Sequence, residues 1–148
     1  MSTVRKLLHD KGETELVSVA ATDTVFHALE IMSEKNTGAV LVTDGDQYVG
    51  ILTERDYARK VVLKGHDSKH LPVRDIMTRE MIMVKPETTV DQCVELMTKY
   101  HVRHLPVIEN ERVIGMVSLR RIALAMIERH KSTIVELENY IMGTGYGR

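Results

Sequence analysis

Hydrophobic and polar positions follow the same order in two halves of the chain. Residues 17–62 align without a gap onto residues 82–127, and nine of the 46 aligned pairs are identical, against about three expected from average composition. In each half, a short apolar run precedes apolar residues at helical spacing, two further apolar runs and a second helical stretch. The pattern therefore predicts one supersecondary unit that is used twice.

Each unit is expected to begin with a short strand, Leu16–Val19 in the first unit and Met81–Val84 in the second. A helix should follow, with Asp23 and Thr88 as candidate N-caps, because their side chains can accept a backbone N–H. Its apolar residues recur at i, i+3, i+4 and i+7, which gives one buried stripe. The stripe comprises Val25, Ala28, Leu29 and Met32 in the first unit and Val90, Cys93, Val94 and Met97 in the second.

Two strands and a second helix complete each unit. The strands are predicted over Ala39–Thr43, Tyr48–Leu52, Arg103–Ile108 and Val113–Val117, with polar turns that suit hairpins inside each pair. The second helices are expected near Glu54–Lys64 and Leu119–His130. This β-α-β-β-α order predicts an α/β (α+β) fold with mixed sheets covered by helices.

The expected organisation along the chain has five parts. These are an N-terminal segment over 1–13, a first repeat over 14–64, a polar linker over 65–74, a second repeat over 75–130 and a C-terminal helix with tail over 131–148. Apolar residues at Ile134, Leu137 and Ile141 form a stripe in the tail helix. Such a short helix is unstable alone, so we expect it to pack on the module or on a second subunit. Residues 143–148 should be loose.

Composition excludes several classes of partner. The chain has 20 Lys and Arg against 21 Asp and Glu, and its net charge of -1 gives no electrostatic basis for binding nucleic acid or an anionic membrane. No apolar run approaches the roughly 18 residues of a membrane span. The single cysteine, Cys93, cannot form an internal disulfide, which favours a cytoplasmic location. His66 and His70 lack a nearby third ligand, so no metal site is predicted.

The candidate chemistry lies where the third strand of each unit meets its second helix. In the first unit, Gly50 permits close backbone approach, Thr53 brings a hydroxyl to the helix N-terminus, and Asp56 follows one turn later. A carboxylate there can accept two hydrogen bonds from a ribose diol. The second unit keeps the hydroxyl at Ser118 but carries Arg121 in place of the acid. The alternative is that Thr53 and Asp56 only cap a helix.

These segments resemble the motifs of cystathionine-β-synthase (CBS) domains. Gly50–Asp56 is similar to their Gly-h-h-Thr/Ser-x-x-Asp signature, Val102–Val107 to their second-strand pattern, and Asp75–Thr78 to the Asp-h-Met-Thr sequence that precedes many such units. The resemblance implies a Bateman module, in which two CBS units pack through their sheets and leave two clefts for adenosyl ligands. Such modules usually form dimers and are not catalysts themselves.

The resemblance also implies a role for individual residues in the first cleft. Asp56 would hold the ribose hydroxyls, with Thr53 beside it. The adenine pocket would be formed by Gly38, Ala39 and Val40, with Val17, Ser18 and Val19 at the base edge. The phosphates would be surrounded by Arg55, Arg103, His104 and Arg120. The second cleft, with Arg121 at the ribose position, should be empty or bind phosphate differently, so one strong nucleotide site per chain is expected.

The expected function is therefore regulatory: the chain binds AMP, ADP or ATP, and binding changes the packing between repeats or subunits. A homodimer and a separate target protein are the expected partners, since no effector domain is visible. Two other hypotheses remain open. One is a ligand-free adaptor or scaffold dimer. The other is a redox-linked regulator that responds to NAD(H), suggested by Tyr57, Arg59 and Lys60, and S-adenosylmethionine is a further ligand of such modules.

Overall fold

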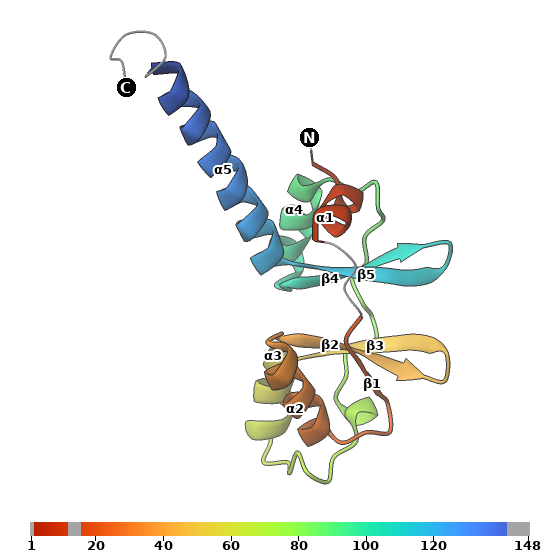
Figure 1. The fold of residues 1–148 in the computed structure, drawn as a ribbon. Coiled ribbons are helices and arrows are strands. Elements are labelled where there is room, and N and C mark those ends of the chain that lie inside the picture. The colour runs from red at the N-terminus through yellow and green to blue at the C-terminus, as the bar shows by residue number, and fades with distance from the viewer. Residues whose placement is uncertain (1, 12–15, 142–148) are drawn as a thin grey trace.

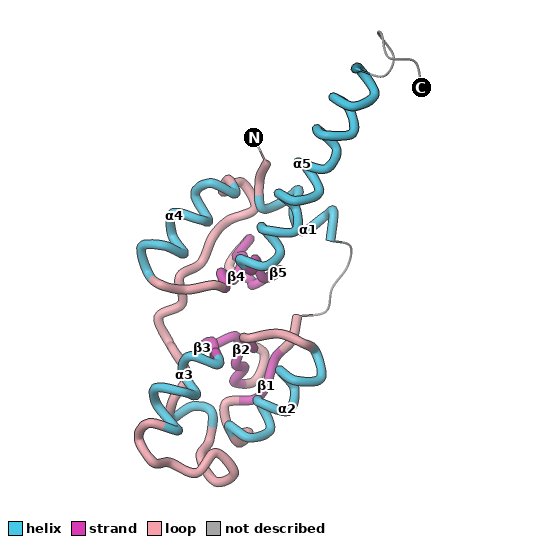
Figure 2. The backbone as a smooth tube through the Cα atoms, turned by 90° about the vertical axis from the view of Figure 1, so that its left-hand side faces the viewer, coloured by secondary structure: helices cyan, strands magenta, loops and turns pink. Residues whose placement is uncertain are grey.

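The computed structural model describes residues 2–11 and 16–141, so the tail expected to be loose lies outside the described residues. The chain forms two units that stack with their strands facing each other and most of their helices on the outer sides (Figure 1). Figure 2 shows the same stacking from the side. The expected α/β architecture of two repeats packed through their sheets is confirmed.

The first unit contains a three-stranded mixed sheet. Its strands are β1 (Ser18–Ala20), β2 (Ala39–Asp44) and β3 (Gln47–Thr53), with α2 (Val25–Lys35) between β1 and β2. β1 runs parallel to β2, which pairs with β3 as an antiparallel hairpin. The second helix starts as α3 (Glu54–Asp56) and continues as the π-helical turn η1 (Tyr57–Val62).

The second unit has a smaller sheet. It contains α4 (Val90–Tyr100) and the antiparallel hairpin of β4 (His104–Glu109) and β5 (Arg112–Ser118). The strand expected at Met81–Val84 is wrong, because this segment makes a single parallel bridge from Val84 to Val107.

A proline explains the missing strand. In the first unit, the Leu41 amide donates to the Val17 carbonyl at 3.0 Å and so extends the pairing of β1 with β2. The residue aligned with Leu41 is Pro106, which has no N–H to donate to the aligned carbonyl of Ile82. The second unit therefore lacks the hydrogen bond that extends the parallel pairing in the first unit.

Both predicted N-caps are wrong by one residue. Thr24 caps α2 and Thr89 caps α4, each accepting the backbone N–H three residues later. Asp23 instead accepts the Ala20 amide at 2.9 Å, and Thr88 accepts the Lys85 amide at 3.0 Å. Both side chains thus stabilise the turn before the helix, a use that their residue types favour equally.

Each hydrophobic core includes a segment from outside its own repeat. The segment between the two units packs into the first core, and helix α1 at the N-terminus packs into the second. Val73, Ile76 and Met77 lie in the core of the first unit, although they follow its last helix; Val73 begins the short 3₁₀ turn η2 (Val73–Asp75). Helix α1 (Val4–Lys11), which the sequence analysis did not predict, adds residues to the core of the second unit. Its buried residues there are Val4 and Leu7. Each unit is thus covered by chain that lies outside its own repeat.

The repeated glycine makes room for these covering segments. A Cβ added at Gly50 would lie 2.8 Å from the Met77 sulfur and 2.9 Å from the Thr78 carbonyl. A Cβ at Gly115 would lie 2.9 Å from Leu8 of α1. The close approach expected at Gly50 is therefore an approach of the protein's own chain, in both repeats.

The C-terminal helix α5 (Leu119–Ile141) is continuous over 23 residues, and it projects away from the body of the molecule (Figures 1 and 2). The expected division into a helix ending at His130 and a separate tail helix is wrong, because no glycine or proline interrupts the sequence between them. Ile122 is buried in the second core. Further along, α5 leaves large apolar side chains exposed, namely Leu124, Met126, Ile127, Ile134, Val135 and Leu137.

Candidate functional site

A cleft of about 1960 Å³ lies between the two units. The first unit contributes the start of β2 and the chain before it, and the second contributes the end of β5, the start of α5 and the start of β4. The lining residues that matter below are Val17, Ser18, Lys35, Gly38, Ala39, Arg103, His104, Ser118, Arg120 and Arg121. The first unit therefore offers backbone and small side chains together with Lys35 of α2, and the second unit offers the arginine side chains.

The structure divides the residues expected to bind a nucleotide into two groups. The residues that line the cleft are Val17, Ser18, Gly38, Ala39, Arg103, His104 and Arg120. Val19 and Val40 instead lie in the first hydrophobic core. Thr53, Arg55 and Asp56 are not among the lining residues either. The side chains expected to hold adenine and ribose together are thus separated.

Gly38 lies where the two units meet. Its carbonyl accepts the Glu54 amide at 3.0 Å, which joins the start of β2 to the start of α3. A Cβ added here would come 3.0 Å from the Glu54 carboxylate and 3.6 Å from the His104 ring of the other unit. The absence of a side chain keeps this end of β2 accessible from the cleft.

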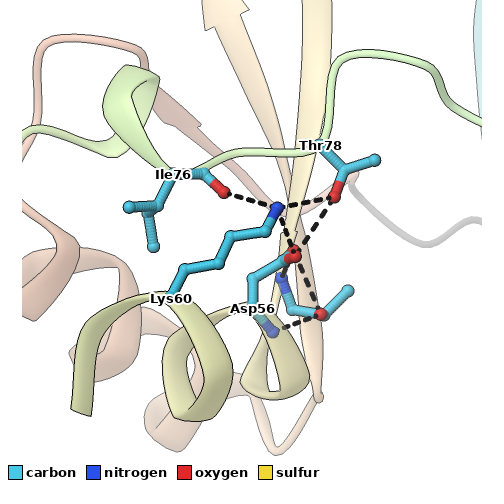
Figure 3. A network of polar contacts seen from close by, with 5 residues as sticks. Asp56, Lys60, Ile76 and Thr78 are labelled. Carbon is cyan, nitrogen blue, oxygen red and sulfur yellow. Dashed lines mark hydrogen bonds and ion pairs between the residues drawn. The ribbon is translucent and has the colours of Figure 1, made fainter. Parts of the chain in front are cut away.

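Asp56 is the buried centre of a polar network (Figure 3). Its Oδ2 accepts the Thr53 backbone N–H at 3.0 Å and the Thr53 hydroxyl at 3.1 Å. Its Oδ1 accepts the Thr78 hydroxyl at 3.1 Å and pairs with the Lys60 ammonium at 2.9 Å. Only 8% of Asp56 is exposed. A carboxylate has about four acceptor sites, so in this arrangement all of them are occupied.

Lys60 and Thr78 are partners of Asp56 that the sequence analysis did not connect with it. Lys60 also donates to the Ile76 carbonyl at 3.1 Å, so it ties the segment before the second unit to the last helical turn of the first. The i, i+4 spacing from Asp56 to Lys60 was a usable signal for this ion pair. Nothing local indicated Thr78, which lies 22 residues from Asp56.

Arg55 connects the two units on the side of α3. Its guanidinium donates to the His101 carbonyl at 2.8 Å, and His101 is the left-handed residue that ends α4. A cation there satisfies a carbonyl at a helix C-terminus, where positive charge is favoured. The structure therefore gives Arg55 a role in holding the units together.

The cleft is strongly cationic. Arg103, Arg120 and Arg121 line it, and within residues 2–11 and 16–141 none of the three forms an ion pair. The Nε of Arg121 is buried and has no hydrogen-bond partner in that part of the chain. Arg5 also lines the cleft, but it already bonds Glu87 at 3.0 Å and Glu109 at 2.7 Å.

Two other candidate chemistries gain no support. Among the described residues, no group of three or more His, Cys, Asp or Glu side chains is arranged to hold a metal. Cys93 is buried, and this burial raises the pKa of its thiol to about 11, which leaves it protonated and inert at neutral pH. In the described residues, no helix is both long and apolar enough to cross a membrane.

Comparison with known proteins identifies the family. The profile of the CBS domain matches residues 12–63 and 73–128. CBSX3, a mitochondrial CBS domain-containing protein of Arabidopsis thaliana, is 40% identical over 153 residues, which cover 98% of this chain and 74% of CBSX3.

Solved structures agree with this match. A CBS-domain protein from Burkholderia ambifaria MC40-6 is 42% identical with a TM-score of 0.81, over 86% of this chain and 95% of that one. PAE2072 from Pyrobaculum aerophilum, solved in complex with AMP, shares the fold at 24% identity and a TM-score of 0.70, over 80% of this chain and 88% of that one. The chain therefore belongs to the CBS domain family, as a tandem pair that forms one Bateman module.

Proposed function

We propose that this CBS-pair module binds an adenine nucleotide, AMP, ADP or ATP, in the cleft between its domains and acts as a sensor. The observation that carries the proposal is the cleft itself, which combines the start of β2 on one domain with arginine side chains on the other. The AMP complex of PAE2072 supports the same ligand class.

The two walls suit different parts of a nucleotide. Val17, Ser18, Gly38 and Ala39 are small or apolar, so a flat base can approach their backbone. The opposite wall, with Arg103, His104 and Arg120, would bind the phosphates through charge-assisted hydrogen bonds. Because the contacts come from both domains, the ligand favours the domain arrangement that brings the walls to the right separation.

In this proposal, Asp56 binds the ribose hydroxyls only if its present hydrogen-bond donors are displaced. For Asp56 to bind a diol, ligand hydroxyls must replace two of its present donors, the Thr78 hydroxyl and the Lys60 ammonium. Both of these donors hold the segment that leads into the second domain. Their replacement would loosen that segment and so pass ligand binding on to the packing of the domains.

A homodimer is proposed as the assembled form, and α5 supports it. The helix extends from the body, with exposed apolar side chains at Ile127, Ile134 and Leu137. These residues lie seven and three apart, a spacing that places them along one seam of a helix pair. A dimer formed in this way would also serve the alternative function, a ligand-free scaffold, which the fully bonded state of Asp56 favours.

We propose no catalytic role, in keeping with relatives that are named as CBS domain-containing proteins. The NAD(H) hypothesis rests on residues outside the cleft, since Tyr57 packs against the first core and Lys60 bonds Asp56. The expected cytoplasmic location is not common to all relatives, because CBSX3 is named as mitochondrial.

A thermal-shift panel with the purified chain tests the proposal. AMP, ADP, ATP, NAD, NADH and S-adenosylmethionine are added separately, and an adenine nucleotide at 100 times its Kd should stabilise the fold by about 2.7 kcal/mol. Arg103→Gln should weaken binding, whereas Arg59→Gln, an exposed change outside the cleft, should not. If no compound shifts the melting temperature, the sensor proposal is contradicted and the ligand-free scaffold is favoured. If only NADH shifts it, the redox-linked regulator is favoured.

A further inference from the structure

We infer that the cleft selects nucleotides that carry at least two phosphate groups, and that Arg121 sets this selectivity. Arg121 would bind a phosphate at the position where a CBS domain with the full signature presents a carboxylate to ribose. The inference rests on the proposed function, because it specifies the ligand of the same cleft.

The charge of the cleft exceeds what one phosphate needs. Arg103, Arg120 and Arg121 line it without an ion pair in the described parts of the chain, and Lys35 adds a fourth cation. Glu34 is the one acidic residue among the described lining residues. A phosphate monoester brings a charge of about −2 at neutral pH. A second phosphate group is therefore needed to balance the charge of the three guanidinium groups that line the cleft.

Arg121 carries a buried side-chain donor that has no acceptor in the described residues. Its backbone N–H donates to the Ser118 hydroxyl at 3.0 Å, which fixes the residue in the first turn of α5. Its side chain lines the cleft, and its Nε is buried without a hydrogen-bond partner in the described residues. A guanidinium has five N–H donors and no acceptor. A phosphate oxygen would satisfy the buried N–H and add a second parallel hydrogen bond.

The comparison with the first repeat explains why this residue decides the ligand. Asp56 and Arg121 occupy aligned positions, each three residues after the hydroxyl that begins its helix. A carboxylate accepts hydrogen bonds from a free diol, whereas a guanidinium favours a phosphorylated group, and nucleotide folds use the same exchange to choose between the two. The two repeats thus carry side chains of opposite charge at this position.

The test compares ligands that differ only in phosphate. Isothermal titration measures adenosine, AMP, ADP, ATP and adenosine 2′,5′-bisphosphate against the full chain. We expect ADP to bind at least about tenfold more tightly than AMP, the worth of one charge-assisted pair. Tighter binding of the bisphosphate than of ADP would place the second phosphate on the ribose, and the reverse order would place it on the 5′ chain. Either order supports the inference.

Two variants isolate the residue. Arg121→Asp should abolish the preference for ADP while AMP still binds, and Arg112→Asp, the same charge reversal on β5 outside the cleft, should keep it. If Arg121→Asp does not fold by circular dichroism, Arg121→Gln removes the charge at similar size. If neither ADP nor the bisphosphate binds the native chain more tightly than AMP, or if the preference is unchanged in the Arg121 variants, the selectivity alone is overturned. No binding by any adenine compound overturns the proposed function as well.

Discussion

The network around Asp56 makes a quantitative prediction about stability. Replacing Asp56 with alanine removes the acceptor for the Thr53 amide, for the Thr78 hydroxyl and for the Lys60 ammonium. The reciprocal capping-box bond from the Thr53 amide to the carboxylate is worth about 1 kcal/mol, and the hydrogen bond from Thr78 about 1 kcal/mol. The ion pair adds less than about 1 kcal/mol, because the Lys60 side chain is 43% exposed and water screens it. Asp56→Ala should therefore lower the free energy of unfolding by about 2–3 kcal/mol.

Urea denaturation followed by far-UV circular dichroism measures this change, because the chain has no tryptophan for fluorescence. Lys60→Met is the matched control: it keeps the apolar stem but removes the ion pair with Asp56 and the hydrogen bonds to the Ile76 carbonyl and the Thr78 hydroxyl. Because the ammonium is partly exposed, this change should cost about 1 kcal/mol, less than Asp56→Ala. Hydrogen exchange at Thr78, whose amide donates to the Ile51 carbonyl at 2.8 Å, should become faster in Asp56→Ala. A loss below about 0.5 kcal/mol in Asp56→Ala would show that the network does not hold the connecting segment.

Three further predictions follow from single features. Burial raises the pKa of the Cys93 thiol from 9.0 to about 11, so the unfolded chain loses this proton at a lower pH than the folded chain. The free energy of unfolding should therefore fall as the pH rises from about 9 to about 11, and it should fall less in Cys93→Ala. Ile127→Glu on α5 should convert a dimer to a monomer by sedimentation velocity, whereas the neighbouring Glu128→Gln should leave the dimer intact. Pro106→Leu restores the N–H that Leu41 has in the first repeat, and slow hydrogen exchange at residue 106 would reveal the longer parallel strand; fast exchange there would contradict the explanation.

The elements that could be predicted are those whose signal is local. The stripes on α2 and α4 have helical spacing, and Val25, Ala28, Cys93 and Met97 are buried as that spacing requires. The two hairpins were also found, since polar turns separate their apolar runs. The N-caps failed by one residue, because Asp and Thr suit the preceding turn as well as the cap.

Errors concentrated where a distant part of the chain decides the outcome. The strand at Met81–Val84 depended on a donor at residue 106, which a proline removes. Helix α1 has few apolar residues of its own, and its place on the second core depends on the space that Gly115 leaves for Leu8. A periodicity within one segment carries no information about such partners.

The sequence by itself provided the duplicated pattern, the order of most elements and the opposite charges at residues 56 and 121, and the resemblance of its motifs indicated the CBS family. Only the stacking of the two domains decided which residues line the same cleft, where Gly38 and Ala39 of the first domain lie with Arg120 and Arg121 of the second. The tertiary structure also decided that Asp56 bonds Lys60 and Thr78. The physical reason is that helical and strand periods follow from short-range geometry. Contacts between repeats arise only when two complete surfaces pack, and no sequence spacing encodes their relative placement.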